Sequence, residues 1–508
     1  MASRTCPGYV NPALDRLQRS IVAIVCIALA AAALISINGS AIEKDAAQNL
    51  QMGLDLCHAG VMSLDEAAPY GPSMYREPLP VATTAAAICI ADRFLGPADS
   101  SLYFSGERAK LVKYQNVAWL VLLWIGVFAA TRWFTGSFWL SIIAGLLAAR
   151  PFLDSTAAEG VNDLYTELPG AALMALASLL VCWAVTRQKP WPMLVAGLVF
   201  GILTVTKAAS LYIFAGIILV LAATYVRGAE RPQRALRLAL LGLQIAGFVV
   251  VVAPWIARNY EDFGKAQISD RGGLVLYTRA LMDQVDPLEY RGTFYVWARP
   301  SLQRYVGSVL GFSARDLDPG GRLERLSGGP GTGVYEHDKE AEAAGRPQDA
   351  ISFYRKARAE RVRLEREFES RGDPHPDVAA DSALQKEGML IVKQVFWANL
   401  ALVVPLIWRS ALLLFPFLAV ALLYALWGKR YQLALFILPS FATLCFYAIA
   451  THFEPRPASI AHPAAIVAAC TLVHLAWRWY GARRTARASS AKYPAVRESE
   501  VPQEGRTD

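Results

Sequence analysis

The acidic side chains best placed for chemistry lie where long apolar runs begin or end. Glu43 and Asp45 directly follow the first such run, and Glu167 opens a later one. An acid at a membrane surface can act as a general base on an acceptor hydroxyl or amine, because apolar surroundings help to tune its pKa. Two simpler interpretations stay open: Asp45 can cap a helix that starts at Ala46, and the Glu167 carboxylate can complement a helix dipole.

Cations occupy the same ends of the apolar runs. Arg76 is followed by Glu77 and Pro78, at the start of an apolar stretch, and Lys207 joins two apolar runs with no polar loop between them. Guanidinium and phosphate geometries match, so Arg76 is a candidate for binding a lipid phosphate. Lys207 can pair with an anionic headgroup. Alternatively, Arg76 is a simple interfacial anchor and Lys207 snorkels to the surface.

Three further polar motifs stand at the same predicted face. They are the loop with Glu159, Asn162, Asp163 and Tyr165, the motif Pro254 to Tyr260 that contains Arg258, and the motif His452 to Pro457 that contains Glu454 and Arg456. Their aromatic residues also suit an interfacial belt, and Glu454 with Arg456 can form an ion pair of little energetic weight. Taken together, the motifs place acids and cations where a lipid phosphate and a polar acceptor would meet.

Composition indicates the elements that position these residues. Of 508 residues, 55% are apolar and 18% are charged, below the roughly 25% charged residues of soluble domains. Apolar runs near the ~20 residues that cross a bilayer recur along the chain. They predict an all-α, polytopic transmembrane helical bundle of about ten spans: 20–37, 112–131, 137–152, 167–186, 191–206, 208–226, 237–256, 410–427, 431–449 and 458–477.

The distribution of lysine and arginine orients these spans. With residues 1–19 in the cytoplasm, nearly all basic turns fall on the inner side, including Arg132, Arg187 and Lys429, as the positive-inside rule expects. Two more apolar stretches, 78–95 and 391–408, predict interfacial helices, because counting either as a span would put basic loops outside.

This threading divides the chain into a transmembrane module, an external domain and a second set of spans. The predicted parts are 20–256 with outer catalytic loops 38–111 and 153–166, an extracytoplasmic domain with an interfacial helix at 257–409, transmembrane helices at 410–477, and a disordered cytoplasmic tail at 478–508. Within the external domain, the charged stretch 351–370 predicts an exposed helix.

Charge and cysteine usage argue against nucleic-acid binding, a zinc site and a disulfide framework. The formal net charge of +8 arises from short clusters between apolar runs and in the tail, which fits membrane orientation rather than nucleic-acid binding. The seven cysteines are scattered and contain no CxxC pair. They predict neither a zinc site nor a disulfide framework.

The order and sidedness of the motifs resemble the GT-C superfamily of integral membrane glycosyltransferases, especially the branch with bacterial aminoarabinose transferase and the dolichyl-phosphate-mannose protein mannosyltransferases. The similarity covers roughly 20–260 and resumes at 410–477. In that family an acid follows the first span, as Asp45 does here, and a Thr-Lys pair closes the fifth, as Thr206-Lys207 does. Near the end of the chain many members carry Glu-x-Arg-Tyr, where this chain has Glu454-Pro455-Arg456-Pro457.

The resemblance implies an inverting transfer of a sugar from a polyprenyl-phosphate carrier to an envelope glycan, lipid or protein. The reaction would take place at the periplasmic face of a bacterial inner membrane. The implied catalytic acids are Asp45, Glu43 and Glu167, and the implied substrate-binding residues are Arg76, Glu77, Lys207, Tyr165, Arg258, Glu454 and Arg456. Cationic side chains can compensate the charge of a phosphate leaving group, so no metal is required, although a divalent metal stays an option.

A membrane protein without enzymatic activity, namely a transporter or flippase of a lipid-linked precursor, is the alternative function. Such a protein would place charges near the midplane of discontinuous helices. A polymerase or ligase of surface polysaccharide would share the transferase chemistry and the same membrane face.

Overall fold

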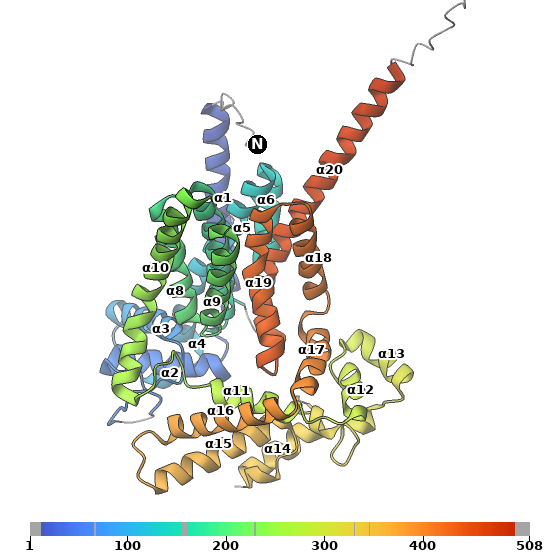
Figure 1. The fold of residues 1–508 in the computed structure, drawn as a ribbon. Coiled ribbons are helices and arrows are strands. Elements are labelled where there is room, and N and C mark those ends of the chain that lie inside the picture. The colour runs from blue at the N-terminus through green and yellow to red at the C-terminus, as the bar shows by residue number, and fades with distance from the viewer. Residues whose placement is uncertain are drawn as a thin grey trace, which may run out of the picture.

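The computed structural model describes residues 12–65, 68–154, 160–227, 230–329, 331–344 and 346–492. Helices, turns and short 3-10 or π segments make up this part of the chain, and it contains no β-strand. Figure 1 shows a bundle of long helices standing above a flatter layer of shorter ones. The predicted all-α fold class is confirmed.

The bundle is built from two sets of helices that lie far apart in the sequence. The first set is α1 (Pro12–Ser36), α5 (Gln115–Thr135), α6 (Phe138–Leu153), α7 (Glu167–Arg187), α8 (Pro190–Thr206), α9 (Ser210–Leu221) and α10 (Arg231–Phe263), and the second is α18 (Leu414–Trp427), α19 (Tyr431–Ala450) and α20 (His462–Lys492). Between α1 and α5, helices α2 (Lys44–Ala59), α3 (Pro78–Leu95) and α4 (Gly106–Lys113) gather at the lower end of the bundle.

Seven helices of the described chain are long and apolar enough to cross a membrane, or eight if one bent pair counts as a span. The seven are α1, α3, α5 joined to α4, α7, α10, α19 and α20. The chain is therefore an integral membrane protein. Every predicted span coincides with a helix, but α6, α8, α9 and α18 are shorter than a full crossing. Helix α3, which the sequence predicts as interfacial, passes the same length and composition test.

Small residues let α8 and α10 pack at close range. A Cβ atom on Gly197 of α8 would lie 2.0 Å from the Gln244 carbonyl oxygen, and one on Gly247 of α10 would lie 2.3 Å from the Leu194 carbonyl oxygen. Glycine at both positions removes this clash, as is common between helices in membranes. The close contact holds α10 against α8, and the lower end of α10 reaches the layer beneath the bundle (Figure 1).

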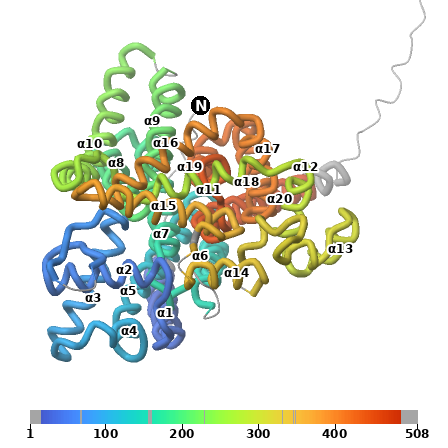
Figure 2. Tube along the Cα trace, turned by 90° about the horizontal axis from the view of Figure 1, so that it is seen from below, coloured from blue at the N-terminus to red at the C-terminus, as the bar shows by residue number. Residues whose placement is uncertain are grey.

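The lower layer is formed by the helices between α10 and α18. They are α11 (Gly272–Met282), α12 (Pro287–Val296), α13 (Pro300–Leu310), α14 (Gly333–Ala343), α15 (Phe353–Ser370), α16 (Pro376–Gln394) and α17 (Phe396–Ala411). The charged stretch is a helix as predicted, but it is not fully solvated, because Phe353 and Ala357 of α15 are buried. The view from below in Figure 2 shows α11, α15 and α16 crossing the lower end of the bundle.

Arg279 of α11 ties this layer to the bundle. Its side chain is fully buried, forms an ion pair with Asp283 at 2.9 Å, and donates hydrogen bonds to the carbonyl oxygens of Ala448 at 3.0 Å and Asn399 at 2.7 Å. These carbonyls belong to α19 and α17. A buried guanidinium needs such partners, so the contact fixes α11 against both helices.

Two boundaries differ from the sequence prediction. The stretch 391–408 is not one interfacial helix: α16 and α17 meet near Val395 at an angle of 97°. Helix α20 continues to Lys492, so 478–492 is helical rather than a disordered tail, and residues from 493 onward lie outside the described chain. Residues 1–11 of the predicted cytoplasmic N-terminus also lie outside it.

The predicted sidedness is tested with single reporter cysteines. Replacement of Gly60, Arg322 or Glu454 should give cysteines that a membrane-impermeant reagent labels in intact cells, because all three residues lie at or below the lower end of the bundle. Cysteines at Arg187, Arg231 and Arg484 should be labelled only after permeabilisation. Labelling of position 322 from the cytoplasmic side alone would contradict the orientation.

Candidate active site

Three arginines from distant segments surround the carboxylate of Asp45. The shortest distances from Asp45 carboxylate oxygens are 3.3 Å to Arg76 Nη2, 3.4 Å to Arg271 Nη2 and 3.1 Å to Arg456 Nη2. Arg76 also donates a hydrogen bond to the backbone carbonyl of Asp45. Four charged groups thus meet at the start of α2, with one negative charge against three positive charges.

The charges in this cluster do not balance. Burial disfavours the Asp45 carboxylate, but the guanidinium groups outweigh that cost and hold the pKa of Asp45 well below its usual value. Burial, and then the neighbouring Arg271, lowers the pKa of Arg76. An additional anion would relieve the repulsion between these cations. The Asp45 side chain is 26% exposed, so the cluster is open enough to receive one.

Tyrosine rings line the cluster. The guanidinium of Arg271 lies 5.4 Å from the Tyr75 ring centre, and that of Arg456 lies 4.7 Å from the Tyr165 ring centre. Both distances fall within the range of cation–π attraction. Burial raises the pKa of Tyr165 to about 12, so its hydroxyl is a hydrogen-bond donor at neutral pH.

Buried polar side chains determine where α2 begins. Lys113 of α4 is fully buried and donates to the carbonyl oxygens of Asn38 at 3.2 Å and Ser40 at 2.8 Å. Asn162 accepts a bond from the Asn38 amide at 2.8 Å and donates one to the Ser36 carbonyl at 2.9 Å. These bonds join the end of α1 to the loop before α7. They satisfy backbone groups that would otherwise be buried without partners.

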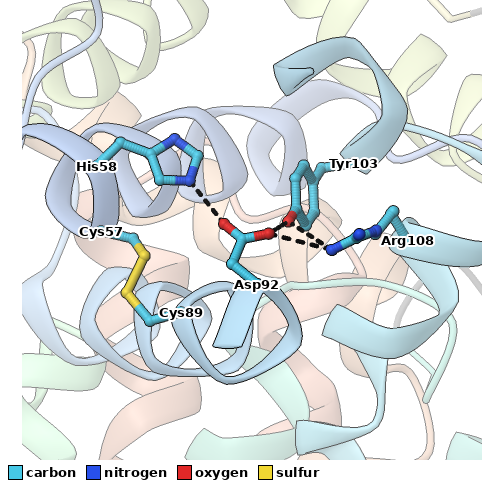
Figure 3. The surroundings of a disulfide bond; sticks show 6 residues. All are labelled: Cys57, His58, Cys89, Asp92, Tyr103 and Arg108. Carbon is cyan, nitrogen blue, oxygen red and sulfur yellow. Dashed lines mark hydrogen bonds and ion pairs between the residues drawn. A yellow bond between two sulfur atoms is a disulfide. The ribbon is translucent and has the colours of Figure 1, made fainter. Parts of the chain in front are cut away.

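A disulfide links α2 to α3. Cys57 and Cys89 are bonded, with their Cα atoms 5.7 Å apart (Figure 3). Beside it, Asp92 accepts from His58 at 2.9 Å and from Arg108 at 3.1 Å. The sequence prediction missed this bond, because residues 32 positions apart pair only when two helices pack side by side.

The same cluster contains metal-binding residue types without forming a metal site. Ligand atoms of Cys57, His58 and Asp92 lie within 4.8 Å of one another. The Cys57 sulfur is bonded to Cys89 and offers no thiolate, which is the form that binds metal. The cluster instead joins α2, which carries Asp45, to α3, which follows Arg76.

Arg271 reaches Asp45 because its own segment is held on both sides. The Asp270 amide donates to the Met74 carbonyl at 2.8 Å, in the loop that carries Arg76. The Gly273 amide donates to Asp381 of α16 at 2.8 Å. Burial, and then the charge of Asp381, raises the pKa of Asp270 to about 9.

Arg456 opens a 3-10 helix, η6 (Arg456–Ala461), between α19 and α20. Glu454 lies 3.8 Å from Arg456 and 3.6 Å from His452. The neighbouring His452 is the largest influence on Glu454, and the pKa of this carboxyl falls to about 2. The sequence suggested a weak pair between Glu454 and Arg456. The shorter contact of Arg456 is instead with Asp45.

Glu167 and Lys207 form a second, closed charge pair. Their side chains lie 2.8 Å apart and are only 5% and 10% exposed, and Thr166 adds a contact to Lys207 at 3.2 Å. Neither sequence interpretation of Lys207 fits this geometry, because the ammonium neither snorkels to the surface nor faces a free site. Its charge is already matched, so it is less suited than the Asp45 cluster to bind an anion.

The remaining predicted residues have different surroundings. Glu43 and Glu77 stand at the N-caps of α2 and α3, where neither side chain caps its helix. Glu77 interacts electrostatically with Arg76 and Lys207, so it lies between the two charge groups.

The suggested capping role of Asp45 is wrong, because α2 begins at Lys44 and Asp45 lies in its first turn. Glu159 lies outside the described residues.

Arg258 braces the lower end of α10. It forms an ion pair with Asp262 at 2.8 Å, donates to the Ser73 carbonyl at 3.2 Å and lies over the Trp255 ring at 4.9 Å. The residue that contacts Asp45 is instead Arg271, which the sequence analysis did not select. The only sequence signal was a polar Asp270-Arg271-Gly272 turn shortly after a span, in a segment without a recognised pattern.

The whole chain resembles known proteins only weakly. No protein-family model matches the sequence, and no match was found among curated proteins. Among solved structures it aligns with the oligosaccharyltransferase AglB from Archaeoglobus fulgidus, in complex with an inhibitory peptide and a dolichol-phosphate. The identity is 14% and the TM-score 0.45, over 96% of this chain and 53% of that one. This chain thus spans about half the length of AglB.

A second alignment is with ArnT from Cupriavidus metallidurans bound to undecaprenyl phosphate. The identity is 13% and the TM-score 0.32, over 95% of this chain and 81% of that one. Both proteins are glycosyltransferases of the GT-C fold, the group that the motif order resembles. At these identities and TM-scores no residue role is transferred to this chain, and its function is argued from its own residues.

Substitutions can test whether the Glu167–Lys207 pair is structural. Lys207→Met should lower the free energy of unfolding by roughly 3–5 kcal/mol, because it leaves a buried carboxylate without its counter-ion. Lys207→Met combined with Glu167→Gln should restore most of the loss. The thermal midpoint in detergent measures both, with Lys189→Met, at the exposed start of α8, as the control. Equal midpoints for the single variant and the parent would refute the pairing.

Proposed function

We propose that the chain is a glycosyltransferase that uses a sugar carried on a polyprenyl phosphate and transfers it to an envelope acceptor. The observation that carries the proposal is the convergence of Arg76, Arg271 and Arg456 on Asp45. Their excess positive charge lies at the end of the bundle, where the phosphate of a membrane lipid would lie. Guanidinium groups bind phosphate through paired hydrogen bonds, and their charge stabilises the phosphate that leaves during transfer.

Asp45 is the proposed proton acceptor for the incoming hydroxyl or amine. With three guanidinium groups around it, the carboxylate is a weak base. A phosphate that drew these groups toward itself would release the carboxylate and raise its pKa, so binding of the donor would prepare the base. Glu43 and Glu167 are less suited: Glu43 stands at a helix cap, and Glu167 is paired with Lys207.

The donor set around Asp45 does not fit a divalent metal. Both carboxylate oxygens face arginines, and a second positive ion would add to their repulsion. The guanidinium groups themselves can stabilise the phosphate that leaves, which is the role a metal would fill. Acceptor choice is assigned to the lower layer, because Arg271 stands at the start of α11 and Arg361 of α15 lies 4.9 Å from the ring centre of Tyr75 beside the cluster.

A transporter of the same lipid is the second candidate. Buried charge near helix ends, as at Glu167 and Lys207, also occurs in transporters. The two functions differ in outcome: purified transferase releases free polyprenyl phosphate from the donor, whereas a transporter moves the donor intact. A panel of radiolabelled polyprenyl-phosphate sugars with detergent-solubilised protein separates them.

The role of Asp45 is tested with an isosteric change. Asp45→Asn should lower turnover roughly 10²–10⁴-fold, the range for loss of a positioned base. Donor binding should stay equal or become tighter, because a competing anion has been removed. Parallel loss of binding and turnover would show instead that Asp45 only organises the arginines. Glu43→Gln is the matched control, since Glu43 lies two residues away in the same helix start.

The role of the arginines is tested by binding alone. Arg271→Ala should weaken the binding of undecaprenyl phosphate about tenfold or more, because a charge-assisted hydrogen bond contributes roughly 1.5–3 kcal/mol. Arg363→Ala is the control, since Arg363 of α15 is exposed and paired with Glu360 and Glu367. Fluorescence or calorimetric titration measures both. Unchanged affinity in Arg271→Ala would remove the proposed phosphate site.

A further inference from the structure

Helix α13 exposes an apolar face that no part of the described chain covers. Leu302, Tyr305 and Val309 recur at the helical spacing of one face. Tyr305 is 70% exposed and Val309 is 64% exposed. The opposite side is packed, because a Cβ atom on Gly307 would lie 2.7 Å from the Tyr295 ring of α12. The helix therefore packs through one side and exposes an apolar face on the other.

A hollow between α12 and α13 extends this face. It has a volume of about 340 Å³ and is lined by Arg291, Phe294, Tyr305, Val306, Val309 and Leu310. All but one of these side chains are apolar or aromatic, and the exception, Arg291, is exposed. A hollow with apolar walls and one cation matches an amphipathic ligand whose charged end is negative.

The position of α12 brings this face to the membrane. Trp408 of α17 donates to the Phe294 carbonyl of α12 at 3.1 Å, and Tyr290 of α12 donates to the Ala401 carbonyl at 3.2 Å. Helix α17 leads directly into the apolar helix α18. Figure 1 shows α12 and α13 at the side of the lower layer, level with α17, and Figure 2 shows α13 at the outer edge.

Helix α17 carries an exposed apolar face of its own. Trp397 is 78% exposed and Val404 is 56% exposed, and Leu413 follows just before α18 at 66%. Tryptophan and tyrosine with aliphatic neighbours are typical of the interface between headgroups and acyl chains. The exposed faces of α13 and α17 thus have the same chemistry on two elements that α12 joins.

The charge of the segment points to one class of partner. Residues 290–313 contain Arg291, Arg299 and Arg304 and no aspartate or glutamate. All three arginines are exposed. An amphipathic helix with basic residues at its edges binds a lipid surface, with its apolar face among the acyl chains and its cations at the phosphates. A protein-binding surface commonly mixes acidic and basic residues, whereas the charged side chains of this segment are all basic, as suits an anionic lipid surface.

We propose that the α12–α13 edge, defined as Arg291, Arg299, Leu302, Arg304, Tyr305 and Val309, inserts into the membrane on the Asp45 side and binds anionic phospholipid there. The apolar side chains enter the acyl region, and the arginines bind headgroup phosphates. This contact is separate from the Asp45 cluster and involves no sugar chemistry. It holds the lower layer at a fixed height against the bilayer.

Photo-crosslinking in lipid nanodiscs tests the insertion. Full-length protein with a benzoylphenylalanine at position 305 is placed in nanodiscs of equal phosphatidylglycerol and phosphatidylcholine, each labelled in turn. The control site is position 356, since Lys356 is an exposed residue of α15 in the same layer. We expect lipid adducts at 305 at least tenfold above those at 356. Equal yields, or an adduct with a second protein chain in place of lipid, would overturn the proposal.

The ratio of the two lipids in the adducts tests the charge. Phosphatidylglycerol should be enriched in the adducts at 305, and Arg291→Ala with Arg304→Ala should bring the ratio down, by up to roughly fivefold for each arginine. The control pair is Arg363→Ala with Arg366→Ala on α15. A ratio near one in the parent would refute anionic recognition even if insertion were found. Neither result depends on whether the protein transfers a sugar.

Discussion

The Asp45 carboxylate is the one negative group that three guanidinium groups from separate segments share directly. Arg76 comes from the loop before α3, Arg271 from the turn before α11, and Arg456 from η6. The carboxylate offsets the mutual repulsion of the three cations, which the surrounding segments bring together. The same interaction therefore joins the first half of the bundle, the lower layer and the C-terminal helices.

Two groups of buried charges show how balance decides what a cluster can do. Glu167 and Lys207 match one to one at 2.8 Å and are nearly closed to solvent. Such a pair is costly to break, and it has little attraction left for a ligand. In the Asp45 cluster three guanidinium groups share one carboxylate, with Glu454 farther away at 3.8 Å from Arg456, so positive charge stays in excess and the cluster is partly open. An incoming anion would lower its energy, so the unbalanced cluster is the one suited to bind a phosphate.

The lower layer shares a hydrophobic core with the bundle and helps to position the residues of the site. Its apolar side chains, among them Met282, Tyr295 and Leu323, are part of the same core cluster as the bundle helices. Arg279 fixes α11 against α17 and α19, and Asp381 fixes the start of α11 beside Arg271. A shift of α11 would therefore move Arg271 away from Asp45. The proposed membrane edge of α12 and α13 belongs to the same layer as α11, although it does not touch the Asp45 cluster.

The sequence alone determined the all-α membrane class of the protein and where most of its apolar helices lie, although it did not find that α3 is long and apolar enough to be a span. Apolar length predicts helices whatever their packing, because backbone groups in lipid must be satisfied within the helix. Asp45, Arg76 and Arg456 were also selected from the sequence, since charged residues at span ends are costly and stand out. The tertiary structure alone decided that they meet, that Arg271 joins them, and that Lys207 is closed off by Glu167. It also decided the pairing of Cys57 with Cys89. These are contacts between residues far apart in the chain, and the periodicity of one segment carries no information about which other segment will pack against it.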